Sequence, residues 1–187
     1  MTGDNNGSQI TNEELQLKQS FLSDAISDIA GNIRFLDTKV SIIMAAIVAM
    51  IGGVLASINT IESLVQNISP CSWLGVLIIF LSIICLISTI SVFIFGINTI
   101  KGRISNFQYN SKWFLTHPMK KYSFTAYKND VLKMNSQDII ENMTAELYKL
   151  NDINKQKMKS MRRVIIAFST SLISAFLLGL VLSLVGG

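Results

Sequence analysis

Few residues of this chain have side chains suited to chemistry, and most of them stand beside apolar stretches. Asp37 and Lys39 precede the first stretch, and Lys157, Arg162 and Arg163 precede the last. Asp37 and Lys39 are two residues apart, so on a helix they point in different directions and each needs another partner. Two roles remain open. The pair either anchors a helix at its depth in a bilayer, or Asp37 forms a latch to one of the three later cations.

A second group mixes aromatic and basic side chains between residues 107 and 128. Such a mixture suits the phospholipid headgroup layer, and the same chemistry suits a nucleobase and its phosphate. Both interpretations stay open. If a nucleotide binds, the candidate residues are Arg103, Lys112, Trp113, Lys120 and Lys121. We expect no nucleic-acid partner.

Other chemistries find little support in the sequence. The single histidine, His117, precedes Pro118 and suits a turn, and no residues have the spacing of metal ligands, so we expect neither a metal nor a cofactor. Serines in the apolar stretches have no His, Lys or Asp at the same depth to activate them. Elsewhere there is no Gly-rich phosphate loop and no carboxylate pair. We therefore expect a protein that is not an enzyme.

Composition indicates which elements position these residues. Only 15% of the 187 residues are charged, and the windows 40–61, 72–100 and 164–185 contain no Asp, Glu, Lys, Arg or His. At 1.5 Å per residue, each window is long enough to cross a bilayer core of about 30 Å. This excludes a soluble globular enzyme. We also expect no cleaved leader, because the first 39 residues are polar.

The polar segments before the first and third spans show helical periodicity. From Leu15 the apolar residues follow the 3–4 spacing of a coiled-coil seam through Leu22 and Ile29, and residues 136–163 show a similar pattern. Each helix is expected to continue unbroken into its span. The seams pack against each other in a plain amphipathic bundle, or against copies of the chain in a homo-oligomeric coiled coil. The expected fold is all-α, with three transmembrane helices, two of them extended into a cytoplasmic helical bundle or coiled coil.

Charge counting predicts the orientation. Segment 98–163 holds 13 Lys or Arg and 5 Asp or Glu, whereas the link between the first two spans carries only Glu62. Basic residues near span ends stay in the cytoplasm, so the N-terminus is expected inside and the C-terminus outside. The expected organisation is a disordered N-terminus (1–10), a cytoplasmic helix (11–39), a first span (40–61), a short external link (62–73), a second span (74–97), a cytoplasmic basic segment (98–163, with helix 136–163) and a third span (164–185).

Small residues recur along the spans at helical spacing. They occupy every fourth position of two spans, at Ala45, Ala49, Gly53 and Ser57 and at Ser171, Ala175, Gly179 and Ser183. The second span repeats small residues every seven positions, at Gly75, Ser82, Thr89 and Gly96. Small side chains let helices approach closely in lipid. They serve either ordinary helix packing or faces that line a water path once the helices rearrange.

The order of several short patterns carries a family resemblance. Asp37-x-Lys39 opens the first span, Phe93-x-Phe95-Gly96 ends the second, and a stretch from Tyr127 to Asp138-Ile139-Ile140 is followed by Leu147-x-x-Leu-x-x-Ile-x-x-x-Lys157 before the third. In these patterns the chain resembles the Pycsar transmembrane effectors, which are bacterial antiphage proteins.

The resemblance implies a multipass protein of the bacterial inner membrane. It implies that cyclic CMP or cyclic UMP, made by a partner cyclase, triggers damage to the membrane and abortive infection. These residues do not include the separate nucleotide-binding domain of some members, so intrinsic binding would fall to segment 98–163. The alternative function is a non-enzymatic scaffold or accessory subunit that recruits a partner through its cytoplasmic helices.

Overall fold

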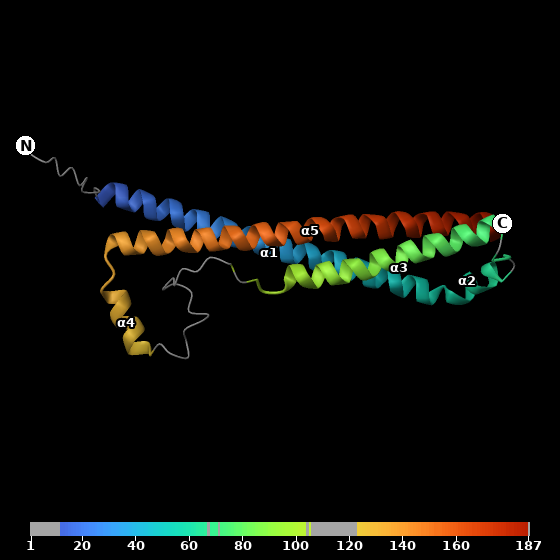
Figure 1. Ribbon diagram of the computed structural model, residues 1–187, viewed down its shortest axis with the longest axis horizontal. Coiled ribbons are helices and arrows are strands. Elements are labelled where there is room, and N and C mark those ends of the chain that lie inside the picture. The colour runs from blue at the N-terminus through green and yellow to red at the C-terminus, as the bar shows by residue number, and fades with distance from the viewer. Residues whose placement is uncertain (1–11, 67, 71, 104, 106–122, 187) are drawn as a thin grey trace, which may run out of the picture. The chain divides into compact units, whose positions relative to one another are not determined.

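The computed structural model describes residues 12–66, 68–70, 72–103, 105 and 123–186. These residues form five helices and no strand (Figure 1). The helices are α1 (Asn12–Ala56), α2 (Ile58–Val65), α3 (Trp73–Ile100), α4 (Phe124–Leu132) and α5 (Ser136–Gly186). Helices α1, α3 and α5 are each long and apolar enough to cross a membrane. The expected all-α fold with three spanning helices is confirmed.

The chain divides into two compact units, and α1 and α5 contribute to both. The polar unit comprises residues 1–32 and 104–154, and the membrane unit comprises residues 33–103 and 155–187. The two helices continue without interruption across this division. The membrane unit therefore receives three helices, while the polar unit receives the first part of α1, α4 and the first part of α5.

In the polar unit, burial follows the predicted seam only in part, because Asn142, Ala145 and Glu146 are buried without belonging to it. On α1, Leu22 is buried, and Leu15 and Ile29 are half-buried. On α5, Met143 and Ala145 are buried. Helix α4 has no buried residue. The start of α5 is capped reciprocally: the Asn135 N–H donates to Asp138 Oδ2 at 3.0 Å, and the Asp138 N–H donates to Asn135 Oδ1 at 2.8 Å.

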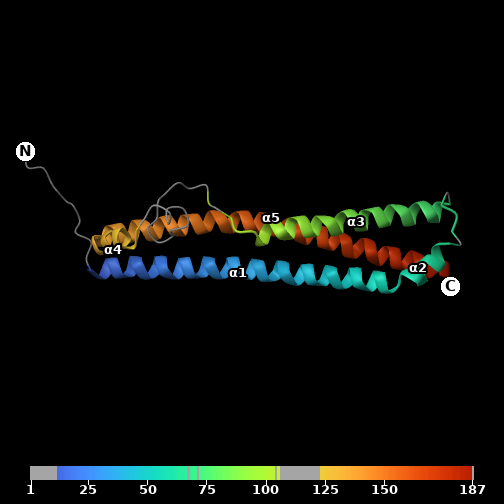
Figure 2. The same cartoon turned by 90° about the horizontal axis from the view of Figure 1, so that it is seen from below.

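In the membrane unit, α3 runs antiparallel to α1 and α5 and lies beside them (Figures 1 and 2). The core of this unit is a small apolar cluster with contributions from all three helices, made by Ile47, Val92, Val164 and Ala167. Several hydroxyl groups inside the unit form hydrogen bonds within their own helix or between helices. Thr99 and Ser88 donate to carbonyls of their own helix, and Thr89 and Ser171 hydrogen bond to each other across α3 and α5 at 3.0 Å.

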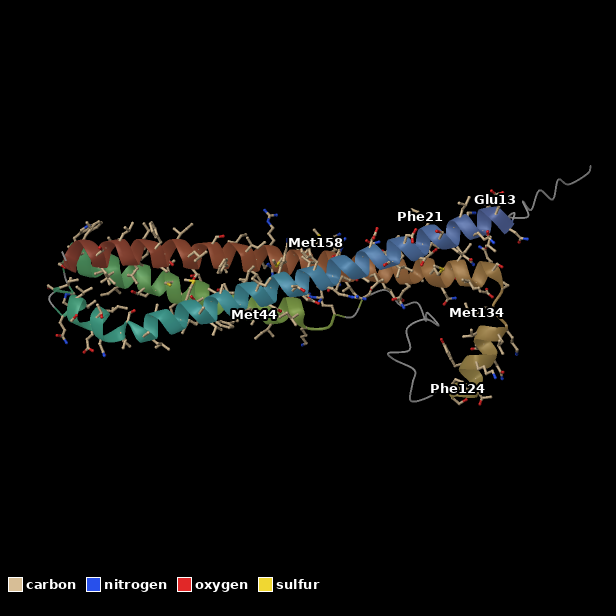
Figure 3. The ribbon with its side chains drawn as sticks, turned by 180° about the vertical axis from the view of Figure 1, so that it is seen from behind. Glu13, Phe21, Met44, Phe124, Met134 and Met158 are labelled. Carbon is tan, nitrogen blue, oxygen red and sulfur yellow. The ribbon has the colours of Figure 1, made fainter. Side chains whose placement is uncertain are left out.

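Most apolar side chains of the spans face outward. Large exposed hydrophobic side chains also occur outside the spans, and Figure 3 labels three of them: Phe21, Phe124 and Met158. Within the spans the same holds for residues such as Phe80 and Phe176, which are 60% and 67% exposed. A helix surface this apolar is compatible with lipid and not with water.

Helix α1 ends earlier than its apolar window. The helix stops at Ala56, and α2 begins at Ile58 after a break at Ser57, whose N–H is shared between the carbonyls of Gly53 and Val54 at 3.1 Å. No proline causes this break. Glycine is a poor helix former, Gly53 is preceded by another glycine, and residues 51–60 are all exposed, so no packing holds the last turns together.

The start of α3 depends on a glycine. Ser72 caps the helix by accepting a hydrogen bond from the Gly75 N–H at 3.1 Å, and its hydroxyl donates to the Ser69 carbonyl at 2.6 Å. A Cβ at Gly75 would collide with the Ser69 carbonyl oxygen and lie 2.9 Å from that of Pro70. The preceding turn can therefore fold tightly over the first turn of α3 only because position 75 has no side chain.

Candidate functional site

A partly buried ion pair joins α1 and α5 inside the membrane unit. Lys157 Nζ donates to the two carboxylate oxygens of Asp37 at 2.5 and 2.7 Å. The Lys157 side chain is 5% exposed and that of Asp37 is 34% exposed. Val40 lies about one helical turn after Asp37, and Val164 lies about two turns after Lys157. Both valines are completely buried. Asp37 thus stands three residues before the charge-free window of α1, and Lys157 stands seven residues before that of α5.

The helical register explains why Lys157 forms this pair. Lys157, Val164 and Ser171 follow one another at intervals of seven residues, and all three are buried on the inward face of α5. Arg162 and Arg163 are exposed. Of the three cations that the sequence offered to Asp37, the structure brings Lys157 to it.

The other basic latch candidates make different contacts. Lys39 lies over the ring of Phe35, with its Nζ 4.1 Å from the centroid, and the Arg163 guanidinium lies 5.7 Å from the centroid of Phe95. Both are cation–π geometries, and Lys39 and Arg163 are exposed residues. Their charges remain near solvent, whereas the charge of Lys157 does not.

A polar pocket of about 340 Å³ lies where α3 ends beside α5. Its lining includes three cations from these two segments and no carboxylate: Arg103, Lys159 and Arg163. Uncharged polar side chains, among them Asn98 and Ser160, complete the lining. Such a set of donors is suited to an anion.

Arg103 organises this pocket. Its Nη2 donates to Ser160 Oγ at 2.6 Å and to the Asn98 carbonyl at 3.0 Å, and its Nη1 donates to Gln156 Oε1 at 3.4 Å. The Asn98 carbonyl belongs to the last turn of α3, where carbonyls have no partner within the helix and favour a cation. The Arg103 Nε is buried with no hydrogen-bond acceptor among the described residues.

Arg103 is the one nucleotide-binding candidate that the structure describes. The other four, Lys112, Trp113, Lys120 and Lys121, lie outside the described residues.

The small-residue rows differ in exposure. Ala45, Ala49 and Gly53 are exposed on α1, and Ser57, which directly follows this helix, is exposed as well. On α5, Ser171 is buried and Ala175 half-buried, whereas Gly179 and Ser183 are exposed. A Cβ added at Gly53 or Gly179 would meet nothing within 4 Å.

Close approach within the membrane unit occurs along α3 instead. A Cβ at Gly96 would lie 2.9 Å from Met44 Sδ and 3.4 Å from a methyl group of Val40, both on α1. Thr89, seven residues earlier, forms the hydrogen bond to Ser171 on α5. Thr89 and Gly96 of the seven-residue repeat therefore pack inside one chain, whereas Ser82 is exposed and much of the four-residue rows faces outward.

Sequence reasoning missed most of the pocket lining. Nothing in the sequence selects Ser160, Gln156 and Asn98, because they are isolated uncharged polar residues near the ends of apolar stretches and belong to no motif. The available signal was positional, because the end of α3 and the segment before the third span had to return to the same boundary of the bilayer.

Metal chemistry has no candidate in the part of the chain that the structure describes. No group of three or more His, Cys, Asp or Glu residues capable of holding a metal occurs there, and Cys85 is a free thiol. The polar pocket, with cationic and neutral donors, is likewise unsuited to a metal ion.

Comparison with known families gives one match. The model of the Pycsar effector protein domain matches residues 21–186, from the first turns of α1 to the last residue of α5, and so covers parts of both units. No curated protein and no solved structure matches the chain.

Proposed function

The chain belongs to the Pycsar effector protein domain family, and from this premise we propose that it impairs the inner membrane of an infected bacterium in response to a cyclic pyrimidine nucleotide. As a member of this family, it is an antiphage effector with membrane-spanning helices. The trigger would be cyclic CMP or cyclic UMP released by a partner cyclase, and the outcome would be abortive infection.

One observation carries most of this proposal. The family domain contains three apolar helices whose charge-free windows hold no Asp, Glu, Lys, Arg or His. Ionisable residues at membrane depth are what pumps, coupled transporters and intramembrane enzymes require. Because this chain lacks ionisable residues in its charge-free windows, we favour movement of its helices against one another over catalysis as its mode of action.

The Asp37–Lys157 pair supplies a resting contact for such movement. It joins α1 to α5 at positions that precede their charge-free windows, and Lys157 is almost completely withdrawn from solvent. Separating the two helices at this level would expose or strand a charge, so the pair favours the closed arrangement. We assign it the role of a latch that a signal must release.

Contact between copies would complete the mechanism. The exposed small-residue positions on α1 and α5, including Gly53 and Gly179, leave room for another helix to approach closely. In this scheme the protein is a homo-oligomer in the bilayer, and rearrangement of these faces opens a leak.

The direct test is dye release from liposomes that contain the purified protein. Cyclic CMP, cyclic UMP and cyclic AMP are titrated separately. We expect a pyrimidine nucleotide to release dye and cyclic AMP to have no effect. Absence of release with every nucleotide would favour the scaffold or accessory-subunit alternative.

Orientation is tested separately by accessibility labelling. The N-terminus and segment 98–163 are proposed to lie in the cytoplasm and the C-terminus outside, because the basic residues concentrate in that segment. Lys120→Cys in a variant without the two native cysteines should be protected from an impermeant reagent in intact cells and become labelled after lysis. Labelling in intact cells would overturn this topology.

A further inference from the structure

We propose that α3 and α5 form a binding site for an anionic phospholipid, with the phosphate in the polar pocket and an acyl chain along an adjoining apolar groove. This inference goes beyond the proposed function and does not depend on nucleotide gating. It rests on two cavities within the membrane unit that share two lining residues.

The polar pocket provides the headgroup end. Arg103, Lys159 and Arg163 contribute three positive charges to a space of about 340 Å³ that has no carboxylate in its lining. A phosphodiester carries one negative charge and several acceptor oxygens, which this set of guanidinium, ammonium, amide and hydroxyl donors can bind.

The buried Nε of Arg103 is a second, independent observation. The guanidinium is held by two of its nitrogens: Nη2 donates to Ser160 Oγ and to the Asn98 carbonyl, and Nη1 donates to Gln156 Oε1. The remaining Nε donor has no acceptor among the described residues. A buried N–H without an acceptor is costly, and a phosphate oxygen would remove that cost.

The apolar groove provides the acyl-chain end. It has a volume of about 360 Å³, and its lining is mostly aliphatic, with Ile84 and Ile87 of α3 and Ile166 of α5 among its residues. Phe95 and Arg163 line both the groove and the polar pocket, so the two spaces meet at this pair. From Phe95 to Ile84 the groove follows about 16 Å of α3.

The position of this double site matches a lipid in one leaflet. The polar pocket lies where the charge-free windows ending at Ile100 and beginning at Val164 meet charged residues. This is the level of the phosphate headgroups, and the groove extends from there into the hydrocarbon region. A free nucleotide or inorganic phosphate would use the cationic end alone, whereas a phospholipid uses both.

The first experiment measures retained lipid by native mass spectrometry. Protein purified from vesicles of phosphatidylglycerol and phosphatidylethanolamine is expected to keep phosphatidylglycerol. Arg163→Gln should weaken retention about tenfold or more, because a charge-assisted contact is lost. Arg162→Gln is the matched control: it removes the same charge one residue away, and Arg162 lines neither cavity. Equal loss in both variants would mean diffuse electrostatic attraction and would overturn the site.

A second pair of variants does not depend on Arg163. Lys159→Gln should reduce retention, whereas Lys155→Gln should not, because only Lys159 lines the pocket and both side chains are exposed. These surface changes are not expected to disturb folding. No difference between them, together with no difference between the arginine variants, would refute the inference.

Variants in the apolar groove distinguish binding of a phospholipid from binding of free phosphate. Thr170→Phe should fill the groove and displace the lipid, while Ser169→Phe, at an exposed neighbour outside the groove, should not. Inorganic phosphate and cyclic UMP are added as competitors. Displacement by either at low concentration, with no effect of Thr170→Phe, would identify a free-phosphate site and would refute lipid binding. Failure of dye release with nucleotides, by contrast, would leave these results unaffected.

Discussion

Replacing Asp37 by Asn is the sharpest test of the ion pair between α1 and α5. The substitution keeps the shape of the side chain but leaves the ammonium of Lys157, only 5% exposed, without its counter-charge. Breaking a buried pair in this way costs about 3–5 kcal/mol. Because Asp37 is 34% exposed and water reaches that side of the pair, we expect about 3 kcal/mol for Asp37→Asn.

Two further variants give the expected order of effects. Lys157→Met removes the buried cation and leaves a carboxylate that water can reach, so it should cost only about 1–2 kcal/mol. Asp37→Leu combined with Lys157→Met replaces the pair by apolar side chains and should lie within about 1 kcal/mol of the original protein. Lys39→Met is the control, because it removes a charge that is exposed two residues from Asp37.

The assay combines unfolding in detergent micelles with dye release from liposomes. If the pair exists only in the closed arrangement, a loss of about 3 kcal/mol shifts the equilibrium toward the open one by about 100-fold. Asp37→Asn should then release dye without nucleotide, Lys157→Met less so, and the double variant and Lys39→Met not at all. Release in the reverse order, or destabilisation by Asp37→Asn with no release, would refute the latch.

The remaining predictions concern glycines. Gly53→Leu and Gly179→Leu should leave membrane insertion and unfolding unchanged, because both positions are open in the single chain. Both variants should nevertheless abolish toxicity in expressing cells, since a large side chain blocks close approach of another helix. Membrane fractionation checks insertion, and undiminished killing by both variants would exclude helix contact between copies as the mechanism. Gly75→Ala should lower stability by about 1–3 kcal/mol in thermal unfolding, because its Cβ collides with backbone. Gly102→Ala, where a Cβ meets nothing within 4 Å, is its control, and equal effects would contradict the steric explanation.

Much of the fold could be predicted because the spacing of apolar residues along the sequence indicates which face of a helix is buried. Leu22 and Val40 belong to the 3–4 seam of α1, and both are buried. The three charge-free windows likewise predicted the three long apolar helices. Both features follow from the helical repeat and the bilayer thickness, which act on each segment independently of its neighbours.

The break at Ser57 and the polar pocket were beyond this reasoning. The helix ends there without a proline, since exposed residues and two glycines leave the last turns unsupported. The pocket depends on the contact of Arg103 with Ser160, which are 57 positions apart. Spacing within one element cannot encode such a contact. The preference of Asp37 for Lys157 over the neighbouring arginines could have been predicted from the sequence. Lys157 is seven residues before Val164, so the two side chains lie on the same face of α5.

The early end of α1 also has a consequence for the surrounding lipid. The charge-free part of α1 runs from Val40 to Ala56, about 25 Å of helix, whereas the 28 residues of α3 extend about 42 Å. Against a hydrocarbon thickness of about 30 Å, this part of α1 lies at the short end of the lengths that can cross, whereas α3 is longer than needed. A helix longer than the hydrocarbon thickness is accommodated by tilting or by local thickening of the bilayer, so we expect such an adjustment around α3, at a cost of a fraction of a kcal/mol per ångström. In the homo-oligomer proposed above, neighbouring copies would share the lipid deformed by this difference in length, which would favour their association.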